Sequence, residues 1–135
     1  MPRPIMGGDY PERPICLHDE QQTESVSVID TSTNTAVRTV TMKGCVPWGV
    51  AITPNGTDAY VTCPPKVSVI DTVSNRIVKT ITVGHGPTGV AITPDGSHAY
   101  VVKNSSSNLL VIDIATNTVV KTLSVGKYPV TVAIN

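Results

Sequence analysis

A unit of roughly 40 residues is repeated along this chain, and the repetition limits the fold more than any other feature. The two fullest copies run from Val46 to Gly84 and from Gly86 to Gly126, and a shorter copy covers 25–40. The same Val-Ile-Asp triplet ends at Asp30, Asp71 and Asp113, with spacings of 41 and 42 residues. Such a period indicates one supersecondary unit used several times, in a solenoid or a propeller.

Within the last full copy, turn residues separate four short segments rich in Val, Ile and Thr. The expected strands are 89–93, 98–102, 109–114 and 118–125, and Pro94-Asp95-Gly96 is typical of the tight turn between the first two. No segment has an apolar stripe with helical spacing. Four antiparallel strands per repeat predict an all-β fold in which each repeat is one blade of a β-propeller.

These repeats resemble a known family. The AYVT segment at 59–62, the two VSVIDT segments and the GVAITPDG turn are similar to the YVTN-type β-propeller repeat, over about 25–135. Proteins with this repeat include archaeal surface-layer proteins and bacterial extracytoplasmic propellers, so the resemblance implies a propeller and an extracytoplasmic or cell-surface location. No signal peptide is visible in the sequence. The family implies no particular activity, because propellers serve many functions.

The strands at the two ends of the chain predict how the blades are completed. Residues 14–18 occupy the second-strand position of the first blade, and 129–134 match the first strand of a further blade. The domain therefore spans 14–135 and holds three blades, one of them split, while 1–13 form a loosely ordered N-terminal extension.

Three blades are fewer than the four to eight of known propellers. We expect two chains to associate head to tail in a six-bladed ring, with 129–134 of each chain completing the split blade of its neighbour. The alternative is that this chain is a fragment of a longer propeller.

The composition argues against several kinds of partner. Ten basic and ten acidic residues give a net charge of zero, so no electrostatic footprint for nucleic acid is present. No apolar run approaches the ~20 residues of a membrane span. The three cysteines, Cys16, Cys45 and Cys63, form no CxxC pair and predict no zinc site. We expect them to be small buried thiols, of which at most two could form a disulfide.

The aspartates that recur in each repeat have the position of turn residues, whose carboxylates bond nearby backbone N–H groups. Positions that differ between repeats are better candidates for function. The loops that join successive repeats, and the loops at 19–24, 64–66 and 103–108, lie at one end of the predicted blades. The candidate binding residues at this channel mouth are Trp48, His85, Lys127, Tyr128, Cys45, Lys66 and Lys103.

No catalytic motif occurs, and Cys45 and His85 lie in different blades, too far apart for the hydrogen bond that a catalytic pair needs. The sequence therefore predicts a non-enzymatic binding or scaffold module without cofactor or metal. Its partners would be a second copy of itself and a protein or glycan ligand at the channel mouth. The alternatives are a small lyase or hydrolase, or a lectin, using the same loops.

Overall fold

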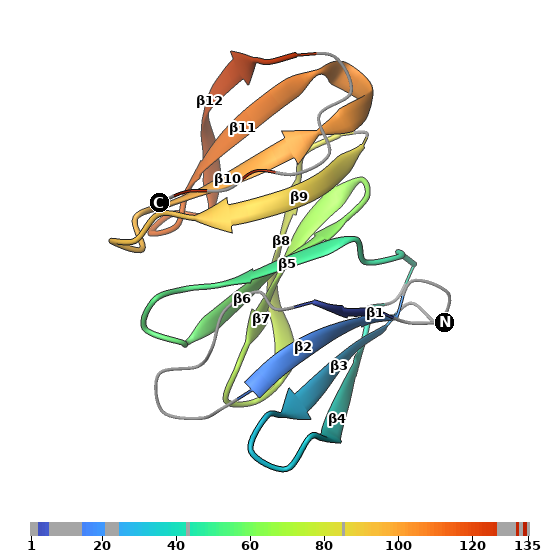
Figure 1. The fold of residues 1–135 in the computed structure, drawn as a ribbon. Helices are drawn as coiled ribbons and strands as arrows, with labels where there is room; N and C mark the ends of the chain where they lie inside the picture. The colour runs from blue at the N-terminus through green and yellow to red at the C-terminus, as the bar shows by residue number, and fades with distance from the viewer. Residues whose placement is uncertain are drawn as a thin grey trace.

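Each repeat forms a four-stranded antiparallel sheet in which the strands follow one another in chain order (Figure 1). The computed structural model describes residues 3–5, 15–20, 25–42, 44–84, 86–126, 132 and 134, with the backbone alone for 3–5 and 15–20. The first sheet contains β1 (Arg3–Ile5), β2 (Ile15–Glu20), β3 (Ser25–Asp30) and β4 (Thr35–Thr41). The second contains β5 (Gly49–Ile52), β6 (Asp58–Cys63), β7 (Lys66–Asp71) and β8 (Arg76–Thr82). The third contains β9 (Pro87–Ile92), β10 (His98–Lys103), the 3₁₀ helix η1 (Asn104–Ser106), β11 (Asn108–Asp113) and β12 (Thr118–Ser124).

The register of the last two strands is the same in all three sheets, including one β-bulge. In the first sheet the partners step from Val28–Arg38 to Ile29–Ala36, so that Val37 is left without a partner residue in the ladder. The same step occurs at the equivalent positions of the second and third sheets. A bulge increases the local twist of the strand pair, so all three sheets have the same twisted outer edge.

The second sheet lies between the other two (Figure 1), and its strands β5, β6 and β7 are buried on both faces, whereas most of β8 is exposed. One apolar cluster joins it to the first sheet and the other joins it to the third. The first cluster contains Val26, Val28, Val40, Met42, Cys45, Val50, Ile52, Ala59, Val61, Cys63 and Ile70. The second contains Ala51, Tyr60, Val67, Val69, Ile81, Val83, Val90, Ala99, Val101, Leu110 and Ile112. Alternate residues of one strand therefore serve opposite interfaces.

The all-β, antiparallel prediction is confirmed, but the described sheets do not close into a ring. The first sheet also differs from the predicted one, because Arg3–Ile5 pair with Leu17–Asp19 and supply the fourth strand from within the same chain. This segment was expected to be part of a loose extension. Most of 129–134 lies outside the described residues. Within the described part of the chain, no helix has the length and apolar character needed to cross a membrane.

The first strands of the second and third sheets approach closely at Gly49. A Cβ atom added there would lie 3.0 Å from the Thr88 carbonyl oxygen and 3.3 Å from Thr62 Oγ1. The Gly49 N–H already donates a 2.8 Å hydrogen bond to that hydroxyl. A side chain at this position would therefore press on the backbone of the neighbouring sheet.

We predict that Gly49→Ala lowers the free energy of unfolding by about 1–3 kcal/mol, the usual cost of adding a methyl group to a packed interior. Gly126→Ala is the matched control, because an added Cβ at Gly126 meets nothing within 4 Å. Urea unfolding followed by circular dichroism measures both changes. Equal stability of the two variants would contradict the close approach of the sheets.

Candidate functional site

The connections between strands gather at the two ends of the stacked sheets. We call one end the loop end; its described connections are 44–48, 64–65, 83–84 with 86, and 104–107. The opposite end is the turn end, formed by the short turns 31–34, 53–57, 72–75, 93–97 and 114–117. Of the predicted binding residues, Cys45, Trp48, Lys66 and Lys103 are described and lie at the loop end, whereas the recurrent aspartates lie at the turn end.

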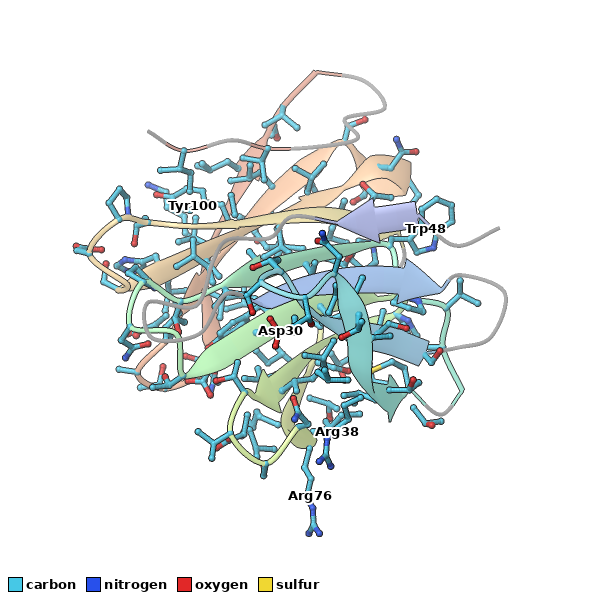
Figure 2. The ribbon with its side chains drawn as sticks, turned by 60° about the horizontal axis from the view of Figure 1, so that its bottom comes forward. Asp30, Arg38, Trp48, Arg76 and Tyr100 are labelled. Carbon is cyan, nitrogen blue, oxygen red and sulfur yellow. A yellow bond between two sulfur atoms is a disulfide. The ribbon has the colours of Figure 1, made fainter. Side chains whose placement is uncertain are left out.

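Trp48 is the most prominent residue of the loop end. Its side chain is 46% exposed, although its backbone N–H donates a 2.9 Å hydrogen bond to the Thr62 carbonyl oxygen. Figure 2 shows the indole well separated from Arg38 and Arg76. The polypeptide at Trp48 is thus fixed by pairing with β6, while a large aromatic surface remains available to solvent.

Cys45 forms a disulfide with Cys63, with a Cα–Cα distance of 5.5 Å. The prediction that all three cysteines are thiols is therefore wrong for this pair. The chain leaving β4 crosses the end of β6, and this brings residues 18 apart in sequence to a separation typical of disulfides. Cys45 is only 7% exposed and supplies no thiol, so it is neither a nucleophile nor a contact residue at the surface.

Lys66 and Lys103 are both half-buried residues of the loop end. Lys66 begins β7 opposite Cys63, and Lys103 ends β10. The Lys103 ammonium lies against Gly84, because a Cβ added at Gly84 would be 3.1 Å from Lys103 Nζ. The neighbouring Asn104 N–H donates a 2.8 Å hydrogen bond to the Gly86 carbonyl oxygen. The predicted candidates His85, Lys127 and Tyr128 lie outside the described residues.

At the turn end, the structural role predicted for the aspartates is confirmed. Asp30 Oδ1 accepts a 2.9 Å hydrogen bond from the Ser32 N–H, and Asp113 Oδ1 accepts one of the same length from Ala115. Asp71 accepts from the N–H groups of Val73 and Ser74. The hydrogen bonds lower the pKa values of Asp30 and Asp71 below the usual range. These carboxylates therefore stabilise turns.

Sequence reasoning missed a shallow hollow of about 210 Å³ at the turn end. The hollow is lined by polar and apolar atoms in similar amounts, and it lies between the first turns of the second and third sheets, which were predicted only as turns. It is smaller than the roughly 300–1,000 Å³ of typical small-molecule sites. Its lining residues are Thr53, Pro54, Asn55, Thr57, Asp58, Asp95, Gly96 and Ile114. Among the described side chains, no three of His, Cys, Asp and Glu gather as metal ligands would.

Comparison with known proteins adds a likeness of fold. No family model matches this chain, and no curated protein matches it. Among solved structures, the hydrazine synthase of Kuenenia stuttgartiensis is similar, with a TM-score of 0.85 and 28% sequence identity. The match covers 96% of this chain but only 37% of that one. The chain therefore spans little more than a third of that structure. In all, 769 solved chains match, so the same architecture occurs in many solved structures.

We predict that replacing Cys45 and Cys63 by serine lowers the free energy of unfolding by about 3 kcal/mol, the value expected for closing a loop of this length. Cys16→Ser is the control and should leave the Cys45–Cys63 linkage intact. The protein is refolded in air-equilibrated buffer, and non-reduced peptides are identified by mass spectrometry. A linkage that includes Cys16 would refute the pairing.

We expect Asp95 to make the turn between β9 and β10 sensitive to acid. Hydrogen bonds from the Thr93 hydroxyl, and then from the Ser97 N–H and hydroxyl, lower the Asp95 pKa to about 2. The pKa of Asp95 in the folded protein lies below the ordinary value of 3.8, so the ionised carboxylate stabilises the folded state fully above about pH 3.8. This stabilisation is lost as the pH falls toward 2. Asn55 holds the equivalent turn through the same kind of hydrogen bonds, without a titrating group.

We therefore predict that Asp95→Asn retains the turn and loses less stability than the unmodified protein between about pH 4 and pH 2. The reciprocal change, Asn55→Asp, should add acid sensitivity. Urea unfolding at several pH values measures both effects. Parallel pH profiles for the protein and Asp95→Asn would contradict this role of the carboxylate.

Proposed function

We propose that the three sheets are blades of a β-propeller and that the chain is a non-enzymatic scaffold whose loop end binds a protein partner. The propeller is supported by the repeated strand order, the repeated bulge and the face-to-face packing of the sheets. The likeness to a longer solved chain is consistent with a unit of three blades within a larger ring. We also retain the YVTN-type family as a proposal.

The observation that carries the binding function is the exposure of Trp48 on a rigid support. Protein–protein interfaces are enriched in Trp, and such residues are most effective when little ordering is needed on binding. Here the Trp48 backbone pairs with Thr62, and the disulfide of Cys45 ties down the preceding loop. Lys66 and Lys103 lie at the same end as Asp19 and Glu20, so charges of both signs are present at the end that carries Trp48, and a partner with polar groups of both signs around an apolar centre would be complementary.

The disulfide also bears on the compartment. Disulfides persist in oxidising surroundings and are rare in the cytosol. The Cys45–Cys63 pair therefore supports an extracytoplasmic location, which is also what the resemblance to the YVTN-type repeat implies.

A displayed library of random peptides tests the proposed binding face. We predict that selected peptides change Trp48 fluorescence on binding and that Trp48→Ala weakens them at least about tenfold, as expected for a central aromatic contact. Val73→Ala is the matched control, because Val73 is 77% exposed at the turn end. Peptides that are sensitive to Val73→Ala and indifferent to Trp48→Ala would contradict the proposal. Trp48-dependent binding on a glycan array, without any peptide binding, would favour the lectin alternative.

A further inference from the structure

The turn between β5 and β6 contains the only Asn-Gly pair of the sequence, Asn55-Gly56. An asparagine loses ammonia when the backbone nitrogen of the next residue attacks its side-chain carbonyl carbon, and a glycine there leaves that nitrogen unshielded because it has no side chain. Asn34, Asn75 and Asn117, which lie in other turns, are followed by Thr, Arg and Thr. The sequence therefore singles out Asn55 as the most reactive amide.

The folded turn holds both of the groups that would react. The Gly56 N–H donates a 2.8 Å hydrogen bond to the Thr53 carbonyl oxygen. Asn55 Oδ1 accepts a 2.7 Å hydrogen bond from the Thr53 hydroxyl, and bonds of 3.1 Å and 3.0 Å from the N–H and the hydroxyl of Thr57. Attack on the Asn55 side chain requires the Gly56 nitrogen to give up its hydrogen, so the bond to Thr53 must break first. Asn55 is exposed to water, but the intact turn restrains the reaction.

The equivalent turn of the third sheet already carries an aspartate in place of this asparagine. Asp95 Oδ1 accepts a 2.6 Å hydrogen bond from the Thr93 hydroxyl, and bonds of 3.0 Å and 2.7 Å from the N–H and the hydroxyl of Ser97. The Gly96 N–H donates a 2.8 Å hydrogen bond to the Thr93 carbonyl oxygen. Gly96 and Gly56 are both left-handed, with φ values of 75° and 76°. An aspartate formed at position 55 would therefore fit its turn without a change of the backbone.

We propose that Asn55 is a site of spontaneous deamidation, that the intact turn restrains the reaction, and that the aspartate product keeps the fold. In the first step the Gly56 nitrogen loses its proton and bonds to Asn55 Cγ, while the side-chain nitrogen leaves as ammonia. Water then opens the resulting succinimide. Cleavage of the new N–C bond gives aspartate, whereas cleavage of the original peptide bond gives isoaspartate. The reaction consumes one water, releases one ammonia and needs no oxidant or reductant.

The two products have different consequences for the turn end. Isoaspartate adds one carbon atom to the backbone, so the bond from the Gly56 N–H to Thr53 and the bonds to the side-chain oxygen no longer have matching positions. Aspartate keeps the backbone and adds a negative charge. Because Asn55 lines the same hollow as Asp58 and Asp95, this charge would be a third carboxylate beside that hollow.

Peptide mapping of the full chain tests the proposal. Trypsin cuts after Lys43 and Lys66 and releases residues 44–66, in which Asn55 is the only asparagine and no glutamine occurs. The mass increase on exchange of –NH2 for –OH in this peptide therefore reports Asn55 alone. In mildly alkaline buffer, we expect the folded protein to deamidate roughly tenfold more slowly, or slower still, than the same protein in guanidinium chloride, because the turn must open first. Equal rates in the two solutions, or an unchanged Asn55 in denaturant, would overturn the inference.

A variant of the turn tests the restraint directly. Thr57→Val removes one hydrogen bond to Asn55 Oδ1 at an exposed position, and it should speed deamidation of the folded protein roughly threefold to tenfold. Thr116→Val is the matched control, because the Thr116 hydroxyl bonds to that of Thr118 in an exposed turn of the third sheet. It should leave the rate at Asn55 unchanged. An unchanged rate in Thr57→Val, or an equal rise in both variants, would refute the restraint.

The fate of the products is tested on the aged protein. Ion exchange separates the deamidated forms, and an isoaspartyl methyltransferase labels only isoaspartate. We expect the unlabelled form to unfold at the same urea concentration as Asn55→Asp, and the labelled form to unfold at a lower one. Equal stability of the two forms would contradict the view that the turn accepts aspartate alone.

Discussion

The burial of strands β5, β6 and β7 of the second sheet on both faces is the constraint on which the rest of the structure depends. Along β6, Ala59, Val61 and Cys63 pack toward the first sheet, while Tyr60 packs toward the third. A strand of this kind has no solvent side, so its sequence cannot show the alternation of apolar and polar residues typical of a half-exposed strand. The three sheets are therefore held together by apolar faces that recur at the period of the sequence repeat.

The same strand also fixes the candidate binding surface. Its last two residues serve opposite neighbours: the Thr62 hydroxyl accepts from the Gly49 N–H and lies 3.5 Å from the Thr88 carbonyl oxygen, and Cys63 is bonded to Cys45. In the sequence, Trp48 lies between Cys45, which is held by the disulfide, and Gly49, which is held by its hydrogen bond to Thr62. The backbone of Trp48 is thus held by its pairing with β6, while its aromatic side chain stays exposed.

The sequence predicts the strands well because the repeat places turn residues at regular intervals. The roles of Asp30, Asp71 and Asp113 also follow from local pattern, since an Asp before a short turn bonds backbone groups only a few residues away. The Cys45–Cys63 disulfide did not follow, because spacing in sequence carries no information on the distance between a loop residue and the end of a strand in the next sheet. The pairing of Arg3–Ile5 was missed because three residues are too few to show a strand periodicity.

The contacts between the sheets and the hydrogen bonds within the turns respond differently to pH. Burial, and then the charge of Asp58, raises the pKa of Tyr60 to about 12, so its hydroxyl keeps the proton that it donates to Asn117 throughout the neutral range. Among the described residues, the two clusters that join the sheets are otherwise built mainly from aliphatic side chains, which do not titrate. The turns instead depend on carboxylates whose pKa values are lowered by hydrogen bonds, and protonation removes that stabilisation in acid. Acid therefore removes stabilisation from these turns, while the apolar packing between the sheets and the Cys45–Cys63 disulfide contain no carboxylate to protonate.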